Sequence, residues 1–193
     1  MSVLRVIKNR RSIREFQRKE IPKEIIDKLI EAVIWAPSAG NLQSRKFYFV
    51  FNRKIKEDLA KASRDQWSFI AKAPLVIVGC TDEKKVEYYG KRGKDLYSIC
   101  DVSVSIQNTM LLAYEQGLGT VWVGAFDEKE VAKILNLSDN LHPIVILPIG
   151  YPAEKPEAPS RVSEEEAIEF IIPARKPRVS GRGDEWQPVA ESR

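Results

Sequence analysis

The apolar positions of the first forty residues recur with the spacing of amphipathic helices, which predicts a short helix over residues 2–10. A second helix is expected to open at Pro22, because proline is favoured in the first helical turn. This helix carries two adjacent apolar rows at spacings of four, which are Ile25, Leu29, Val33 and Ile26, Ile30, Ile34. Such a broad apolar face indicates burial on one side, and Pro37 and Gly40 end the helix.

Farther along the chain, short apolar runs alternate with helical spacing. Strands are expected over 46–51, 75–78, 121–123 and 144–149, and helices over 53–62, 95–116 and 127–135. The run at 75–78 is continuously apolar, which is typical of a strand covered on both faces, and Pro148 indicates an edge or a bulge in the last strand. The charged residues 81–94 predict a mobile surface segment. The alternation as a whole predicts an α/β layer structure in which helices cover a sheet.

The length of 193 residues suits one domain with a proper core. We expect this domain to span residues 1–172, and residues 173–193 to form a C-terminal tail that is extended or wrapped on a partner subunit. With 44% hydrophobic and 30% charged residues, the composition is that of a soluble globular protein. The net charge of +4 is spread along the chain, so nucleic acid is not an expected partner.

Several other classes of protein are disfavoured by what the sequence lacks. No apolar run reaches the ~18 residues that span a bilayer and no signal region opens the chain, so no membrane association is expected. Cys80 and Cys100 are the only cysteines, which favours a reducing, cytoplasmic location. With His142 as the only histidine, neither an ordinary zinc site nor a catalytic triad is supported. Neither the P-loop nor the Rossmann motif occurs, so any demanding chemistry is expected to come from a cofactor.

Two polar clusters remain to be explained. The segment Arg10–Arg14 reads Arg-Arg-Ser-Ile-Arg, which puts three guanidiniums and a hydroxyl at one helix end. Planar, permanently charged guanidiniums suit an anionic ligand, and the alternative is a solvated helix terminus. The segment Ala36–Gln43 is polar and turn-forming, and it directly follows the strongly amphipathic helix.

The order of these and later motifs resembles the nitroreductase family of FMN-dependent oxidoreductases. The chain reads R-x-S-x-R, A-P-S-x-x-N-x-Q, a long helix with Gln107-Asn108, G-L-G-x-x-W-x-G and G-Y-P, between about residues 5 and 162. Each motif alone is weak, but five in this order are specific. The resemblance implies an α+β three-layer sandwich with a central mixed sheet flanked by helices. It also implies a homodimer with a shared active site and one FMN per site at the subunit interface.

The resemblance further implies which residues contact the flavin. The implied cofactor-binding residues are Arg10, Arg11, Ser12, Arg14, Pro37, Ser38, Asn41, Gln43, Gln66, Val123, Gly124 and Arg161. Arg10, Ser12 and Arg14 hold the phosphate, ribityl and pyrimidine ends between them, and Arg11 contributes its backbone or side chain. Arg161 contacts the phosphate, and the alternative is a solvated arginine. Residues 37–43 reach the flavin from the partner subunit, and the backbone of Val123 and Gly124 approaches flavin N5. Many relatives continue the second motif with Pro and an aromatic residue, whereas this chain reads Ser44-Arg45-Lys46-Phe47, which leaves the contacts of 43–46 open.

The activity implied by the resemblance is a ping-pong hydride transfer through flavin N5. NADH or NADPH is the donor, and a small oxidised aromatic compound, such as a nitroaromatic, quinone or flavin-like molecule, is the acceptor. No catalytic side chain and no metal is implied. One alternative is a flavin-binding or flavin-consuming relative without turnover, and a more distant one is a basic nucleic-acid-binding module.

Two aromatic features are left with alternative interpretations. Residues 81–97, with Tyr88, Tyr89 and Tyr97, form either a lid that faces the acceptor or a solvated connection. Trp122 either flanks the flavin or belongs to the core.

Overall fold

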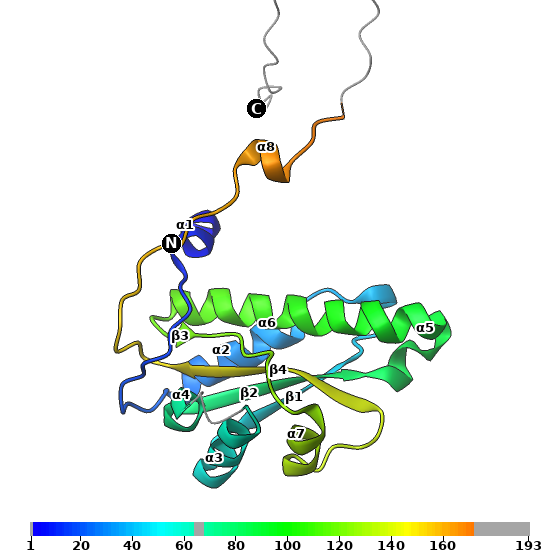
Figure 1. Cartoon of the computed structure of the whole chain (residues 1–193), viewed down its shortest axis with the longest axis horizontal. Coiled ribbons are helices and arrows are strands. Elements are labelled where there is room, and N and C mark those ends of the chain that lie inside the picture. The colour runs from blue at the N-terminus through cyan, green and yellow to red at the C-terminus, as the bar shows by residue number, and fades with distance from the viewer. Residues whose placement is uncertain (1, 64–67, 172–193) are drawn as a thin grey trace, which may run out of the picture. The chain divides into compact units, whose positions relative to one another are not determined.

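The strands of the computed structural model form one four-stranded sheet in the order β1-β2-β4-β3 (Figure 1). The structure describes residues 2–63 and 68–171, and the chain divides into two units, Met1–Ala158 and Pro159–Arg193. The strands of the first unit are β1 Arg45–Val50, β2 Leu75–Asp82, β3 Gly119–Thr120 and β4 Leu141–Gly150. All three strand pairings are antiparallel, and outside the strands an isolated parallel bridge joins Ser12 to Thr120.

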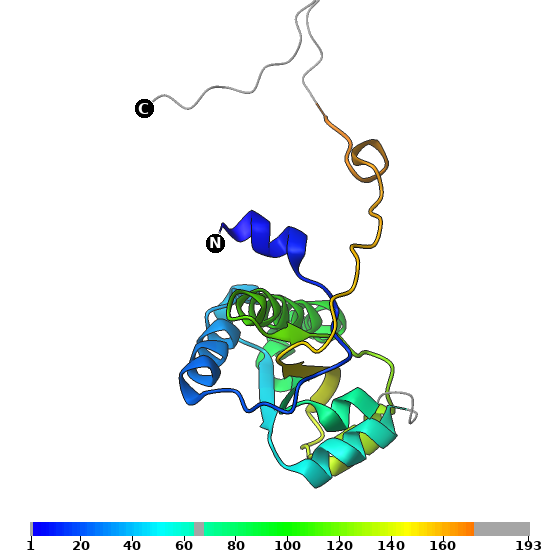
Figure 2. The same cartoon turned by 90° about the vertical axis from the view of Figure 1, so that its left-hand side faces the viewer.

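Helices cover both faces of this sheet (Figures 1 and 2). The helices of the first unit are α1 Val3–Asn9, α2 Lys23–Ile34, α3 Arg53–Ala62, α4 Ser68–Lys72, α5 Gly90–Arg92, α6 Ser98–Glu115 and α7 Glu128–Ile134. In β2, Ile77 packs with α2 and α6, and its neighbours Val76 and Val78 pack with α3, α4 and α7. Alternate residues of a strand face opposite sides of the sheet, so the continuously apolar β2 is buried on both. The predicted three-layer α+β architecture is confirmed.

The strand expected at 121–123 is wrong: β3 covers only Gly119–Thr120, Val123 forms an isolated bridge to Ile146, and the cause is Pro148. One register joins Thr120 to Ile149 and Val123 to Ile146, and it would set Val121 opposite Pro148. Ile146 exchanges both backbone hydrogen bonds with Val123, so its N–H and C=O point toward the segment that follows β3. Two residues farther along β4, the backbone of Pro148 points to the same side, but proline has no N–H to donate. The ladder is interrupted there. Of the two expectations for this strand, an edge or a bulge, the edge is wrong, since β4 lies between β2 and β3. Its register against β2 does shift, but opposite Gly79 and Cys80 rather than at Pro148.

Residues 81–94 were expected as a mobile surface segment; the first two end β2, and the rest form short helical turns. The 3₁₀ turns of η2 cover Glu83–Tyr89, α5 follows, and the π-helical η3 covers Gly93–Tyr97. A single apolar side chain, that of fully buried Val86, fixes this charged stretch, and Gly93 packs so closely that a Cβ there would meet the Val86 carbonyl oxygen at 2.5 Å. One buried anchor among many charges gave too weak a periodic signal for the sequence to reveal these turns.

The second unit contributes one short helix, α8 Glu164–Ala167, to the described residues. Its N-cap is Ser163, whose hydroxyl accepts a hydrogen bond from the Glu166 N–H at 3.2 Å. The predicted tail at 173–193 lies outside the described residues. Within the residues described, no helix is both long and apolar enough to cross a membrane, and no cluster of three or more His, Cys, Asp or Glu side chains is arranged to hold a metal ion.

Candidate functional site

The basic segment Arg10–Arg14 is fixed along one edge of the sheet. Ser12 forms the parallel bridge to Thr120, and the backbone N–H of Ile13 donates to the Thr120 carbonyl at 3.0 Å. This contact requires a glycine at 119, because a Cβ there would lie 2.6 Å from Ile13 Cγ1. The segment that holds the guanidiniums is therefore part of the folded sheet rather than a free helix end.

The three arginines have different surroundings. Arg10 is half-buried and is the C-cap of α1. The Arg11 guanidinium folds back and donates to the carbonyls of Lys8 and Arg10, each at 2.8 Å, so this side chain caps α1. The backbone N–H groups of Arg14 and Glu15 both donate to Oε1 of Glu154, the latter at 3.1 Å, while the Arg14 side chain is exposed.

Val123 lies on the same edge, three residues after Thr120, which is bridged to Ser12, and Gly124 follows it. Val123 is buried and exchanges hydrogen bonds with Ile146 at 2.9 and 3.0 Å, and Gly124 is exposed. Among the described residues, Thr120 Oγ1 is buried without a hydrogen-bond partner. An unpaired buried hydroxyl costs free energy, so its presence beside a cationic segment fits a polar, anionic ligand that would supply the missing bond.

The second polar cluster, Ala36–Gln43, forms a tight turn built around η1 Ala39–Asn41. The Ser38 hydroxyl accepts from the Gln43 N–H at 3.0 Å, and the Asn41 N–H donates to the Ser38 carbonyl at 3.0 Å. Asn41 and Gln43 adopt positive φ values of 57° and 52°. Pro37, Asn41 and Gln43 are exposed, so the turn presents polar groups to solvent.

The two clusters lie at opposite ends of α6. The turn is tied to Asp101 near the start of this 18-residue helix, through the Ala39 N–H at 2.9 Å. The segment Arg10–Arg14 is joined to Thr120, which follows the end of the helix. From Asp101 to the last helical residue, Glu115, the helix rises by roughly 20 Å. The structure thus brings Arg10–Arg14 together with Val123 and Gly124, but it does not bring either near Pro37–Gln43 of the same chain.

Three other predicted residues have separate outcomes. Gln66 lies outside the described residues. Arg161 belongs to the second unit, where its guanidinium donates to the Ser160 carbonyl at 3.0 Å, and its phosphate contact stays a prediction. Trp122 is 38% exposed, and its indole lies beside Gly124, so the interpretation of this residue as core was wrong.

Sequence reasoning missed Glu154 and Thr120. Glu154 stands in a stretch rich in proline and charge, where one more carboxylate gave no signal. Thr120 stands just before the strand expected at 121–123 and gave no signal, because the missing partner of its hydroxyl is visible only after folding.

The layered fold is of the α+β class, and one edge of its sheet carries the cationic segment Arg10–Arg14. The sequence model of the nitroreductase family matches residues 7–151, and the chain belongs to that family. A protein of Methanothermobacter thermautotrophicus named "Putative NADH dehydrogenase/NAD(P)H nitroreductase" is 32% identical over 160 residues, which cover 81% of this chain and 80% of that protein.

Two further comparisons agree with this assignment. A Bacillus subtilis protein named as an FMN reductase is 27% identical over 177 residues, covering 84% of this chain and 71% of that protein. The crystal structure of a nitroreductase family protein from Clostridium difficile 630 gives a TM-score of 0.78 at 33% identity, covering 88% of this chain and 98% of that one. The family predicted from the five motifs is confirmed.

Gly119→Ala is expected to disturb the site through Ile13. The new methyl group would force the segment Arg10–Arg14 away from β3, at a cost of about 1–3 kcal/mol in the free energy of unfolding. Flavin affinity should fall as well, because the displaced segment carries the cations. Denaturant unfolding and a titration with FMN measure the two effects.

Gly117→Ala is the matched control for this prediction. Gly117 has φ +76° and no atom within 4 Å of a built Cβ, so alanine there costs about 1 kcal/mol of backbone strain without touching Ile13. Flavin affinity should stay at the wild-type value. Equal loss of affinity in both variants would contradict the role given to the Gly119–Ile13 contact.

Proposed function

We propose that this protein is an FMN-dependent oxidoreductase that uses NADH or NADPH to reduce a small oxidised aromatic acceptor, such as a nitroaromatic, a quinone or a flavin-like ring. Family membership and the relatives named as NAD(P)H nitroreductase and FMN reductase support the donor and the cofactor. The observation that carries the proposal is the cationic segment Arg10–Arg14 bound to the sheet beside the buried, unpaired Thr120 hydroxyl.

The chain's own residues bind and orient the cofactor. When bound, FMN supplies hydride transfer at its N5 atom. Arg10, Ser12 and Arg14 are assigned to its anionic groups, because fixed guanidiniums offset both the phosphate charge and the negative charge that a ring gains on reduction. The backbone at Val123 and Gly124 is assigned to the ring, with exposed Gly124 allowing a close approach.

We propose that the second half of each site comes from a second copy of this chain. A two-fold axis across the middle of α6 sets the start of one helix beside the end of the other. The turn Pro37–Gln43 of one copy then meets the segment Arg10–Arg14 of its partner. A single chain cannot achieve this, because both clusters are fixed to opposite ends of one rigid helix.

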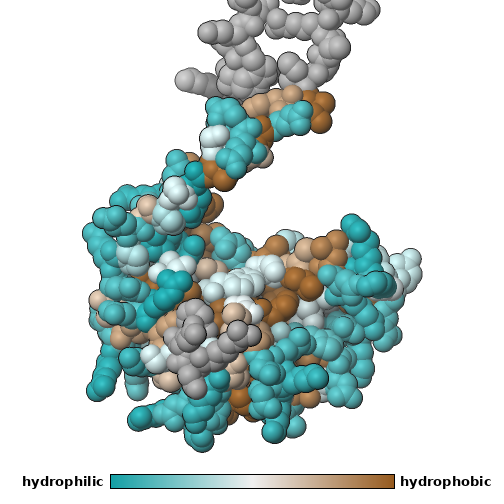
Figure 3. Space-filling view, viewed as in Figure 1, coloured by the Kyte–Doolittle hydropathy of each residue, from teal (hydrophilic) through white to brown (hydrophobic). Residues whose placement is uncertain are grey.

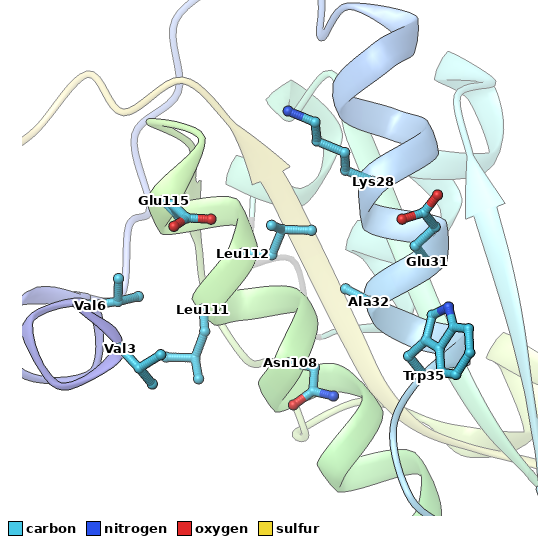
Figure 4. Close-up of a pocket in the computed structure, with 10 residues that line it drawn as sticks. All are labelled: Val3, Val6, Lys28, Glu31, Ala32, Trp35, Asn108, Leu111, Leu112 and Glu115. Carbon is cyan, nitrogen blue, oxygen red and sulfur yellow. The ribbon is translucent and has the colours of Figure 1, made fainter. Parts of the chain in front are cut away.

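An apolar surface in the same region supports this arrangement. Figure 3 shows hydrophobic surface over the N-terminal half of α6, where Ile99 and Val104 are 40% and 38% exposed. Farther along, a groove of about 440 Å³ lies between α1, α2 and α6 (Figure 4). Val3, Leu111 and Trp35 line it, and Trp35 is 82% exposed. Large exposed apolar faces mark interaction sites, and a second copy would bury this one.

The absorption spectrum of the purified protein is the direct test. A yellow protein that releases FMN on denaturation supports the cofactor, and a colourless protein that takes up no added FMN contradicts it. Anaerobic addition of NADH and of NADPH then distinguishes an oxidoreductase, whose flavin bleaches rapidly, from a flavin-binding protein without turnover. Loss of absorbance near 450 nm on the stopped-flow timescale would also show which nicotinamide is preferred.

We propose that η2, α5 and η3 form the wall that the acceptor meets. Tyr89 stacks edge to face with Tyr88 and Tyr97 at centroid distances of 5.3 and 5.2 Å. A Cβ on Gly40 would meet the Tyr89 hydroxyl at 2.4 Å, so this tyrosine lies directly on the turn Ala36–Gln43. The aromatic cluster and the turn therefore form one surface.

Replacing Tyr88 and Tyr89 together by alanine is expected to raise the KM for an aromatic acceptor by about fivefold or more, because each lost ring contact is worth about 0.5–1.5 kcal/mol. Reduction of the flavin by the nicotinamide should change less. Steady-state kinetics with a quinone and stopped-flow reduction separate the two half-reactions. Tyr114→Phe on α6 is the control. An unchanged acceptor KM in the double variant would reject the assignment.

We also propose a reducing, cytoplasmic setting. Both cysteines are free thiols, with Cys80 buried in β2 and Cys100 exposed on α6. Burial raises the pKa of the Cys80 thiol to about 12, so only Cys100 is expected to react readily with thiol reagents in the folded protein.

A further inference from the structure

A buried carboxylate holds the turn Ala36–Gln43 at two points. Asp101 on α6 is 3% exposed, and its Oδ1 accepts from the Ala39 N–H at 2.9 Å. Its Oδ2 accepts from the N–H and the hydroxyl of Ser44, at 3.1 and 2.7 Å. One carboxylate thus clamps the start of η1 and the residue that follows the turn. Charged acceptors form stronger hydrogen bonds than neutral ones, and burial removes the competition from water.

A buried guanidinium holds the other side of the same turn. Arg45 is 8% exposed and donates to the carbonyls of Ile34, Ala36 and Pro37 at 3.0, 2.7 and 2.8 Å. These carbonyls belong to the end of α2 and the entrance of the turn. Desolvation lowers the pKa of Arg45, an effect that nearby Asp101 opposes. Arg45 therefore ties the end of α2 to the first residue of β1, and its planar fork suits several carbonyls at once.

Between these two anchors the backbone is strained. Gly40, Asn41 and Gln43 all have positive φ, at 54°, 57° and 52°. For a residue with a side chain this region is costly, by about 1 kcal/mol or more, and it persists only where the surroundings impose it. Within the turn, Ser38 accepts two hydrogen bonds, one from the Gln43 N–H to its hydroxyl and one from the Asn41 N–H to its carbonyl. The strained backbone conformation therefore depends on Asp101 and Arg45, which hold the turn from outside.

We propose that Asp101, Ser44 and Arg45 are positioning residues that fix the turn Pro37–Gln43 in its flavin-contacting shape before the flavin binds. This inference rests on the proposed function, in which that turn reaches the flavin of a partner copy. The three residues touch neither cofactor nor substrate, since all are buried behind the turn. They act through the backbone, by presenting Pro37, Asn41 and Gln43 in one conformation.

The same contacts give a physical reason for the departure from the family pattern at Ser44 and Arg45. Ser44 and Arg45 stand where many relatives have proline and an aromatic residue, and here their side chains provide four of the six carbonyl and carboxylate contacts just described. The polar pair replaces a stiff proline by a hydrogen-bonded clamp. A turn that is ordered in advance loses less conformational entropy on binding, which raises affinity.

The experiment compares Asp101→Asn, Arg45→Met and Ser44→Ala with a matched control, Lys56→Met. Lys56 is a second buried cation that donates to backbone carbonyls, those of Ala73 and Pro74 at 2.6 and 3.3 Å, on the opposite face of the sheet. Three measurements are made on each protein. They are hydrogen exchange of the backbone amides of residues 38–44 in the flavin-free protein, the FMN dissociation constant by flavin fluorescence, and the thermal unfolding midpoint.

The proposal predicts that Asp101→Asn and Arg45→Met accelerate exchange at Ala39 and Ser44 and raise the FMN dissociation constant by about tenfold. Lys56→Met should lower the unfolding midpoint similarly, yet leave exchange in 38–44 and FMN affinity within twofold of wild type. Ser44→Ala removes a single hydroxyl, so it gives a smaller shift in the same direction and remains informative if the other two variants fail to fold.

Three outcomes overturn the proposal. Unchanged exchange at 38–44 in the three variants means that the turn does not need these anchors. Faster exchange with unchanged FMN affinity, or equal loss of affinity in Lys56→Met, means that the cluster is structural only. If wild-type protein binds no FMN, the proposed function is wrong, and hydrogen exchange still decides whether the three residues fix the turn.

Discussion

The double variant Arg10→Ala, Arg14→Ala is expected to be isolated without flavin and to bind added FMN at least about 100-fold more weakly than the wild type. Each hydrogen bond to a charged group is worth about 1.5–3 kcal/mol, which is roughly 10- to 150-fold in affinity per arginine. The fold should survive, because the backbone of this segment is held by Thr120 and Glu154 rather than by the arginine side chains of positions 10 and 14. Flavin fluorescence titration of the apoprotein measures the loss.

The single variants are also expected to change the reduction potential of the bound flavin. Removing a cation disfavours the reduced, more negatively charged flavin, so Arg10→Ala and Arg14→Ala should each shift the flavin potential downward. Arg53→Ala is the charge-matched control, because Arg53 is an exposed residue whose side chain pairs with Glu57 one turn away, at 2.9 Å. The control should keep wild-type affinity and potential. Full flavin and unchanged activity in both Arg10→Ala and Arg14→Ala would refute the site assignment.

Two separately defective chains are expected to restore flavin binding when they are unfolded, mixed and refolded together. One chain carries Arg10→Ala and Arg14→Ala, and the other carries Asn41→Ala and Gln43→Ala in the turn. If each site takes Arg10–Arg14 from one copy and Pro37–Gln43 from the other, a mixed dimer has one intact and one doubly defective site. Random pairing then gives intact sites at about a quarter of the wild-type number.

The control for this experiment is each variant refolded alone, which should stay near its own low flavin content. The number of sites with wild-type affinity is counted by titrating the mixture with FMN, and size-exclusion chromatography verifies the dimer. A mixture that merely averages the two parents would mean that both clusters act within one chain, against the roughly 20 Å that α6 places between them. A monomer with full affinity would contradict the shared site altogether.

Much of the fold could be read from local patterns. The helix expected at 53–62 coincides with α3, and the helix expected at 127–135 is α7, which begins with the Asp127 carboxylate accepting from the Glu130 N–H at 3.0 Å. These features depend on neighbours within four residues, so the sequence contains them directly. The five ordered motifs likewise identified the family, because each motif is a short run of residues.

The failures occurred where distant residues meet. Pro148 determines where β3 stops, and its effect depends on a register between strands that are about thirty residues apart in sequence. Trp122 looked like a core residue, yet the interruption opposite Pro148 leaves it at the surface beside Gly124. Neither result could be inferred from the local pattern, since the same sequence in an uninterrupted strand would bury the indole.

The sequence by itself determined the family, the order of the main helices and strands, and the two clusters that contact the cofactor in the proposed site. Only the tertiary structure decided that these clusters lie at opposite ends of α6, that Glu154 and Thr120 belong with Arg10–Arg14, and that Asp101 and Arg45 hold the turn. The physical reason is the range of the interactions. Periodicity and capping act over one or two helical turns, whereas a buried charge or hydroxyl finds its partners only after the layers have packed.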